Sequence, residues 1–484
     1  MVKTFMTLGK KATSGVVWVT ASLGSTQIIN FIASIVLARL LTPELFGQFA
    51  LITVVVYFLT VFCEFGLGTA IIQTKRSDAT TVNTAFTVVV VLSALFAILV
   101  GFFATEISLF FDEPTTSTPL KVMTLCILLL PLSLIPGSLL ERNLDFKKRV
   151  IAEIVPTFLS SVLAVILAWL NFGIWSLVFR SVSFSLFTAL MVWHATAFSP
   201  RLIIDLQIAR ELLRYGFHVT LASLLLYAAV NLDRLYISYY VDTETLGYYG
   251  LGLLIGNWVG NIAPIINRVM LPAFSRKQDD YSVLSAAYLK VLRLLFFILL
   301  PLSIGIFVIT PRLVLIVYGE AWLPAAVFIR ILVFLGLLRG FNSLIGPIFN
   351  ATGQPEVLVR IIILRLITLV PLLFSLGDIS GAIGVGIAGI IAMGLATAYA
   401  LILASRTLGI PILSINMFGF APSLATLIMG LGVFIASTQM SEGILSLIGL
   451  ILIGILLYGG TVLLITPTNT LQETMADVRL LIIP

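Results

Sequence analysis

The chain has 484 residues, of which 60% are hydrophobic and only 10% are charged, and its mean hydropathy is +1.14. This composition excludes a soluble protein and predicts a membrane-embedded one, because about 20 consecutive apolar residues form a helix that spans a bilayer. The excess of 28 Lys and Arg over 22 Asp and Glu is a topology signal in such a protein, so no nucleic-acid partner is expected.

The first apolar run follows three lysines. Lys3, Lys10 and Lys11 precede a run from about Val16 to Leu41, and no small-residue cleavage pattern interrupts it. We therefore interpret this run as an uncleaved first span rather than a signal peptide. Together with the later apolar runs it predicts about fourteen spans. The spans lie near 16–40, 46–72, 82–104, 120–140, 150–170, 173–197, 215–240, 246–273, 290–310, 324–350, 357–376, 381–404, 417–437 and 444–466.

Basic residues gather in every second predicted loop. The loops on the side of the N-terminus carry Lys75, Arg76, Arg142, Lys147, Lys148, Arg149, Arg201, Arg210, Arg214, Arg276, Lys277, Lys290 and Arg293. The opposite loops carry few bases and many acids, namely Arg39, Lys121, Arg312, Glu106, Asp112, Glu113, Asp242, Glu244, Asp378 and Glu442. Because Lys and Arg accumulate in cytoplasmic loops, this asymmetry predicts that both termini lie in the cytoplasm.

The second half of the chain echoes the first. An Ala-Ser-Leu motif, a following asparagine and a Glu-x-x-Gly loop recur at similar spacing in 21–49 and 222–249. This recurrence predicts two six-helix lobes related by a pseudo-two-fold axis along the membrane normal, plus two C-terminal helices. The predicted parts are an N-terminal lobe at 1–199, a C-terminal lobe at 200–415, and two additional helices with a cytoplasmic tail at 416–484.

Polar residues share one helical face in several predicted spans, and arginines occur at similar depth. The polar residues proposed for a site are Gln27, Asn30, Asn231, Asn257 and Asn261. The arginines are Arg180, Arg234, Arg268, Arg339 and Arg365. Charged groups within the membrane usually face a bundle interior, and guanidinium groups match phosphate oxygens. These ten residues are therefore the candidate substrate-binding residues, with the arginines as partners of a pyrophosphate or an acidic sugar.

For any single arginine, an interhelical salt bridge or a side chain that snorkels to the interface remains the alternative. Arg330 lies about half a turn away from Arg339, so it is left outside the site. Glu64 and Asp233 are candidate ion-coupling carboxylates for Na+ or H+. Asp233 lies off the polar stripe of its span, which favours a structural role.

No cofactor or metal site is expected. Cys63 and Cys126 fall inside apolar runs, so neither a disulfide nor a metal centre is indicated. Residues 384–389 match the dinucleotide-binding glycine pattern, but they lie inside an apolar span, which favours a small-residue face for helix packing. A phosphate-loop signature is absent from the sequence, and no large polar domain could hold catalytic groups, so an enzyme is not expected.

Several short segments together are typical of one family by their order and spacing. They are 37–43, 46–47, 64–67, 232–238, 246–249, 271–275, 301–305 and 317–322. These segments resemble the polysaccharide exporter and Wzx-type oligosaccharide flippases of the multidrug/oligosaccharidyl-lipid/polysaccharide exporter superfamily. The likeness covers nearly the whole chain. One departure is Glu64, which stands where that family usually has Asp.

The resemblance implies a multi-pass protein of the bacterial inner membrane, with fourteen helices in two lobes that alternate access. The implied substrate is an undecaprenyl-pyrophosphate-linked oligosaccharide, moved from the cytoplasmic to the outer leaflet for O-antigen, exopolysaccharide or capsule biosynthesis. Membrane lipids and a polysaccharide polymerase are the implied partners. Two alternatives stay open: a cation-coupled multidrug exporter of the same superfamily, and a membrane polysaccharide polymerase or ligase. Surplus arginine counts against the former, and the lack of a large outer loop against the latter.

Overall fold

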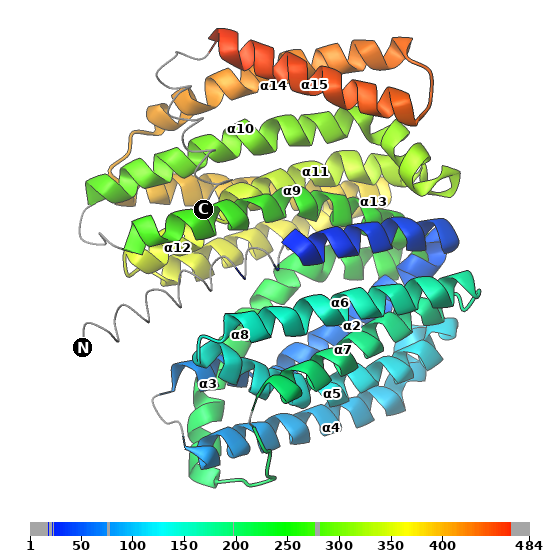
Figure 1. Cartoon of the computed structure of the whole chain (residues 1–484), viewed down its shortest axis with the longest axis vertical. Coiled ribbons are helices and arrows are strands. Elements are labelled where there is room, and N and C mark those ends of the chain that lie inside the picture. Colours follow the sequence, from blue (N-terminus) through cyan, green and yellow to red (C-terminus); the bar gives the residue numbers. More distant parts are fainter. Residues whose placement is uncertain are drawn as a thin grey trace. The chain divides into compact units, whose positions relative to one another are not determined.

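The computed structural model describes residues 18, 22, 24–74, 78–196, 198–275 and 281–465, without the side chains of 264–275, 281, 283 and 412–418. Every element in this part of the chain is helical (Figure 1). The first is Gly24–Leu40. The others are α2 (Pro43–Glu64), α3 (Leu67–Gln73), α4 (Ala79–Phe110), η1 (Pro114–Thr116), α5 (Ser117–Arg142), α6 (Phe146–Trp169), α7 (Ile174–Ala195), α8 (Leu206–Tyr240), α9 (Thr243–Ser275), α10 (Tyr281–Leu313), η2 (Val314–Tyr318), η3 (Glu320–Trp322), α11 (Ala325–Asn342), α12 (Ile345–Ala351), α13 (Glu356–Leu408), α14 (Ile412–Gln439) and α15 (Ile444–Ile465).

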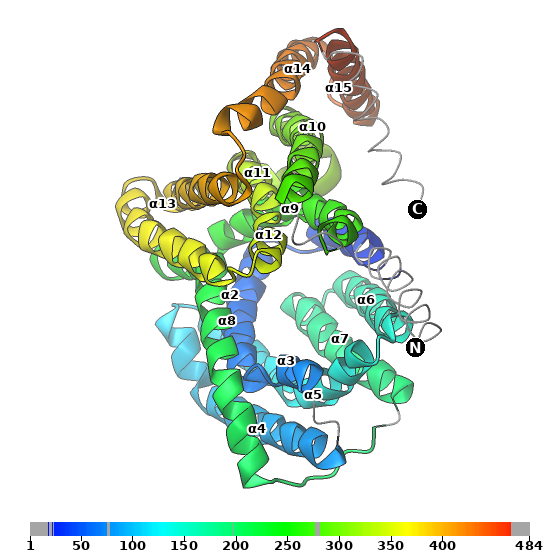
Figure 2. The same cartoon turned by 90° about the vertical axis from the view of Figure 1, so that its left-hand side faces the viewer.

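Eleven helical segments in the described residues are long and apolar enough to cross a membrane. This confirms the predicted all-α polytopic architecture, whereas the number fourteen stays a prediction. One of the eleven, α13, has 53 residues and is interrupted at Ser380 and Gly381, whose backbone angles are not helical. The interruption lies where the sequence separates the predicted spans 357–376 and 381–404. Figure 2 shows that α13 is not a continuous rod.

Two helices begin well before their predicted spans. Helix α8 begins at Leu206 and α10 at Tyr281, against predicted starts near 215 and 290. In α8 the side chain of Asp205 accepts hydrogen bonds from the backbone N–H groups of Gln207 and Ile208, at 2.9 and 3.0 Å. Such a cap satisfies backbone donors that the first turn leaves free. Hydropathy marks the part of a helix that lies in lipid, so it misses a capped polar extension.

The chain forms two compact units, 1–247 and 248–484. In the first unit α4 packs against α5, and both α5 and α6 pack against α7, while α2 contacts α5 and α8 (Figure 1). In the second unit α10 packs against α11 and α14, α14 against α15, and α11 against α13. The boundary falls within α9, five residues after the helix begins. The predicted division into lobes at residue 199 stays a prediction.

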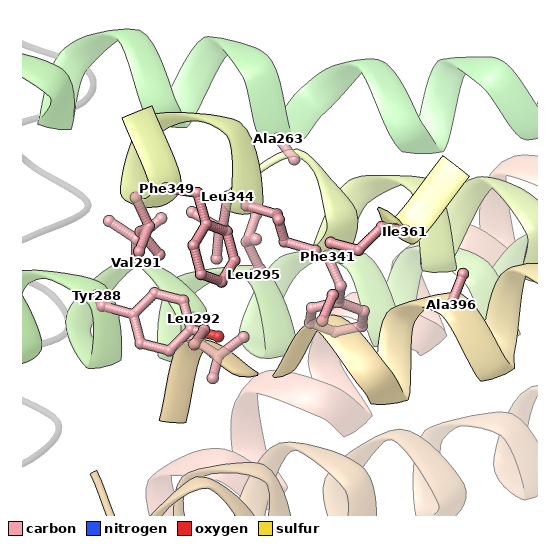
Figure 3. Close-up of a cluster of buried hydrophobic side chains, with 14 of the residues drawn as sticks. Ala263, Tyr288, Val291, Leu292, Leu295, Phe341, Leu344, Phe349, Ile361 and Ala396 are labelled. Carbon is pink, nitrogen blue, oxygen red and sulfur yellow. The ribbon is translucent and has the colours of Figure 1, made fainter. Parts of the chain in front are cut away.

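The core of the second unit gathers side chains from α10, α11, α12 and α13 (Figure 3). Tyr288, Leu292 and Leu295 of α10 are fully buried there, and Phe349 of α12 joins them. Apolar burial of this kind stabilises a helix bundle mainly through close packing, since lipid tails are as apolar as the side chains. This core holds α10 and α11 together and so fixes the position of the polar groups on α11.

Glycines bring α9 and α11 into close approach. A Cβ atom on Gly256 would collide with the backbone carbonyl of Leu332, and one on Gly336 would collide with that of Gly256. Small residues at such a crossing let two backbones approach closely. The predicted small-residue face at 384–389 is also confirmed, because a Cβ on Gly386 would lie 3.1 Å from Ile331 of α11.

Candidate functional site

Arg180 joins three helices of the first unit. Its Nη2 donates to the Oδ1 of Asn30 at 2.7 Å and to the Oγ of Ser161 at 3.4 Å. Thus α7 is linked to the helix Gly24–Leu40 and to α6. Nearby apolar packing of Leu37 and Leu177 sets this arrangement, because both side chains are buried in one small cluster. Two predicted site residues, Arg180 and Asn30, are therefore in direct contact.

A second arginine and asparagine pair lies on α8. The Nη1 of Arg234 donates to the Oδ1 of Asn231 at 3.2 Å, and the Nδ2 of Asn231 donates to the carbonyl of Tyr227 at 3.1 Å. The Tyr227 hydroxyl in turn donates to the carbonyl of Val54 at 2.5 Å, which ties α8 to α2. Spacing of three and four residues places all these α8 groups on one face. Three residues of the predicted polar stripe of this span, Tyr227, Asn231 and Arg234, thus form a connected chain of hydrogen bonds.

The second unit contains a third such pair. Arg339 of α11 donates to the Oδ1 of Asn257 on α9, and Asn342 of α11 donates to Thr397 of α13. Asn257 directly follows Gly256, so the close crossing of α9 and α11 brings the two side chains within reach. The pair therefore depends on the glycine contact as well as on its own chemistry.

The hydrogen-bond partners of Arg180 and Arg234 are neutral, so these bonds orient the two guanidinium groups without cancelling their charge. For Arg180 and Arg234 no ion pair with a carboxylate is present among the residues that the structure describes. A guanidinium has five N–H donors, and one or two bonds to amide or hydroxyl oxygens leave several for a ligand. Arginine forks are well suited to phosphate oxygens. Both groups can therefore bind an anion.

Four candidate residues remain besides these three pairs. Gln27 is half-buried on the first helix, Asn261 is exposed on α9, and Arg365 is half-buried on α13. Arg268 lies in α9, within the stretch whose side chains fall outside the described part of the structure. For these four residues the predicted role in binding stays a prediction.

The two candidate ion-coupling carboxylates lie on different helices. Asp233 is buried in α8, and its Oδ1 accepts a hydrogen bond from the backbone N–H of Arg234 at 2.8 Å. Glu64 is half-buried at the end of α2, where the chain passes through left-handed conformations at Phe65 and Gly66 before α3 begins. Groups of three or more metal-binding side chains do not occur among the residues searched. Ion coupling through either carboxylate stays a prediction.

One polar cluster was not anticipated from the sequence. The carboxylate of Glu113 accepts hydrogen bonds from Gln48 at the start of α2, at 3.1 Å, and from Thr243 at the start of α9, at 2.5 Å. In the sequence, Glu113 is only one of several acidic residues that indicate topology. The available clue was the recurrence of the Glu-x-x-Gly loop in 43–49 and 243–249, because it marks two helix starts of similar construction.

Reciprocal glycine contacts accompany this cluster. A Cβ atom on Gly47 would collide with the backbone carbonyl of Thr243, and one on Gly247 would collide with the carbonyl of Pro43. The two helix starts also share their capping, since Thr42 accepts from the N–H of Leu45 at 3.5 Å as Asp242 accepts from that of Thr245 at 2.6 Å. The repeated loops thus lie backbone to backbone within the first unit.

The chain is similar in sequence to known polysaccharide biosynthesis proteins. A sequence profile of the family described as "Polysaccharide biosynthesis protein" matches residues 36–327. The succinoglycan biosynthesis transport protein ExoT of Rhizobium meliloti (strain 1021) is 26% identical over 354 residues, which are 72% of this chain and 71% of that protein. The lipopolysaccharide biosynthesis protein WzxC of Escherichia coli (strain K12) is 24% identical over 389 residues, 78% of each chain.

A solved structure shows the same fold. The lipid II flippase MurJ, in an inward closed conformation, superposes with a TM-score of 0.76 at 17% sequence identity. The match covers 91% of this chain and 97% of that one. At so low an identity the likeness concerns the architecture of the helices and not the residues of a site.

Proposed function

This chain belongs to the family of polysaccharide biosynthesis proteins, and from that premise we propose that it is a flippase for lipid-linked oligosaccharides. Its relatives are named for the biosynthesis of succinoglycan and lipopolysaccharide, and one of them is named a transport protein. The substrate proposed is an undecaprenyl-pyrophosphate-linked oligosaccharide, which moves from the cytoplasmic to the outer leaflet by alternating access. The glycan is then assembled into a surface polysaccharide.

One observation carries this proposal: Arg180 and Arg234 lie inside membrane spans and are held by neutral partners. A charged side chain at the centre of a bilayer costs at least about 2.5–3.5 kcal/mol on insertion scales, so it requires a compensating role. A salt bridge with a carboxylate would offset this cost but would contribute nothing to substrate binding. Arginines kept charged by asparagine and serine are instead suited to an anionic ligand.

The physical problem of the transport step matches this arrangement. A pyrophosphate group cannot enter hydrocarbon without partners, because burial of an unpaired charge is very costly. Arginines along the path replace the water that the pyrophosphate loses, while the polyprenyl tail stays in lipid. The polar faces that carry Asn30 and Asn231 provide hydrogen-bond partners for the sugars.

We extend the proposal to location and energy source. The protein is placed in the bacterial cytoplasmic membrane with both termini in the cytoplasm, as the charge asymmetry of the loops supports. It acts as a carrier rather than an enzyme. Transport is driven by product consumption in a polysaccharide polymerase or by Na+ or H+, with Glu64 and Asp233 as the candidate coupling groups.

The test is a flipping assay in proteoliposomes with a polyprenyl-pyrophosphate-linked oligosaccharide. Arg180→Gln and Arg234→Gln remove charge but keep hydrogen-bonding capacity, and each should lower the initial rate about tenfold or more, as expected for loss of a charge-assisted bond. Arg330→Gln is the matched control. Arg330 donates to the carbonyl of Phe307 at 3.1 Å and lies over its ring at 5.4 Å, so it already has partners. This control should flip at the wild-type rate.

Two results would contradict the proposal. In the first, the wild type moves the lipid-linked oligosaccharide and both Gln variants move it equally fast, so the arginines have no part in transport. In the second, the wild type does not move this lipid but expels cationic drugs under an ion gradient, and a multidrug exporter takes the place of the flippase. Circular dichroism and matched protein levels exclude misfolding as the cause of any loss.

A further inference from the structure

The middle of α2 presents two exposed aromatic side chains. Tyr57 is 52% exposed and Phe58 is 41% exposed, whereas every other residue from Leu45 to Ile71 is buried or half-buried. Phe58 contacts neighbouring rings, with centroids 5.1 Å from Phe62 and 5.7 Å from Tyr227. Tyr57 differs, because its side chain makes no hydrogen bond and no ring contact within the described part of the chain. Its ring face and hydroxyl are therefore available to a ligand.

The surroundings of Tyr57 are cationic. Its hydroxyl interacts electrostatically with the Arg180 guanidinium, and the Tyr227 hydroxyl interacts in the same way with Arg234 and with Tyr57. Guanidinium groups within a span avoid acyl chains and face a watery or protein-lined interior. Tyr57 lies on α2, which packs against α7 and α8, the helices that carry Arg180 and Arg234. Its exposed ring is therefore placed near the groups that would hold an anion.

We infer that Tyr57 is a sugar-binding residue, on whose ring the pyranose attached directly to the pyrophosphate stacks while Arg180 and Arg234 hold the phosphates. This inference rests on the proposed function and names the substrate feature that the site reads. The C–H face of a pyranose is apolar and packs on an aromatic ring, and the phenolic hydroxyl can hydrogen-bond a sugar hydroxyl. In this lipid the first sugar is covalently joined to the pyrophosphate, so an aromatic ring next to the arginines lies where that sugar must lie.

The experiment measures binding by the purified full-length protein in detergent. Two lipids are compared, a polyprenyl pyrophosphate that carries one hexose and the same lipid without sugar. The wild type should bind the glycosylated lipid more tightly. Tyr57→Leu should weaken binding of the glycosylated lipid about tenfold and leave the bare lipid unchanged, whereas Tyr57→Phe, which keeps the ring, should stay within about twofold of wild type. Phe102→Leu is the control and should bind both lipids like wild type. Phe102 is also an exposed aromatic residue, 74% exposed, but it lies on α4.

The outcomes separate this inference from the function on which it rests. Equal affinities of Tyr57→Leu and wild type for the glycosylated lipid overturn the role of Tyr57 and leave the flippase intact. An equal loss of affinity for both lipids in Tyr57→Leu also overturns the role of Tyr57 in sugar binding, because Tyr57 would then act on the fold or on the arginines. If the wild type binds neither lipid, the proposed function fails, and the sugar site fails with it. Arg180→Gln should weaken the binding of both lipids by the same factor.

Discussion

At the scale of single residues, the asparagines are as informative as the arginines. Asn30, Asn231 and Asn257 each accept a hydrogen bond from a guanidinium. An aspartate at any of these positions would form a stronger bond and would also cancel the charge. At Arg180 and Arg234 a neutral acceptor therefore orients the guanidinium without cancelling its charge.

The substitution Asn30→Asp tests this idea. It places a carboxylate where Asn30 now accepts from Arg180 at 2.7 Å, so it should lower the rate of lipid flipping about tenfold while leaving the melting temperature equal or higher. Asn30→Ala should instead lower stability by about 1 kcal/mol, the typical worth of one hydrogen bond. Flipping and thermal unfolding are measured on the same preparations. Normal flipping by the Asp variant would mean that the charge of Arg180 is not used.

The sequence identified the members of these pairs but not the pairing. Helical periodicity placed Asn231 and Arg234 on one face, and their contact follows from a spacing of three residues. Arg180 and Asn30 are 150 positions apart, so their contact depends on how three helices pack. Ser161 was missed for the same reason, because a lone hydroxyl in an apolar run has no signal of its own.

At the scale of helices, the hydropathy of the chain predicts which segments cross the lipid. Hydropathy identified these segments because every backbone polar group in lipid must form its hydrogen bond within a helix. It could not predict where helices extend beyond the membrane, as at the start of α8. Nor did it locate the break between α2 and α3, which lies inside a continuous apolar run. The close crossing of α9 and α11 had a sequence signal, glycines at every fourth position from Gly252 to Gly260.

Two alanine substitutions on α9 should have opposite effects on stability. Gly250 has open space around it, so Gly250→Ala should stabilise the helix by up to about 1 kcal/mol through helix propensity. Gly256→Ala gains the same propensity but places its Cβ against the backbone of Leu332, and should destabilise by about 1–3 kcal/mol. Thermal unfolding in detergent compares the two. Equal melting temperatures of the two variants would contradict a close crossing of α9 and α11.

At the scale of the whole molecule, the distribution of charges predicts the orientation in the membrane. Helix α5 spans Ser117–Arg142, and its two ends carry loops of opposite character: an acidic segment precedes it and a basic segment follows. Because only basic cytoplasmic loops are retained efficiently, the start of α5 should face outward. The sequence alone suffices for this inference, since topology depends on composition and not on side-chain geometry.

Cysteine labelling tests the orientation. In a variant without the native Cys63 and Cys126, a single cysteine is introduced as Thr118→Cys or Asn143→Cys, both at exposed positions. A membrane-impermeant thiol reagent should label position 118 in intact cells and position 143 only after permeabilisation. The reverse pattern would place both termini outside the cell and invert the proposed direction of transport.

The contact between Gly47 and Thr243 has a genetic consequence. The atoms that a side chain at position 47 would strike belong to the backbone of Thr243 and Gly247, and no replacement of a side chain can withdraw them. Because glycine has no side chain to shorten, a change at one of these positions cannot make room for a side chain at the other. A search for second-site suppressors of Gly47→Ala should therefore recover none at position 247, and the two positions can change only together with the path of the chain.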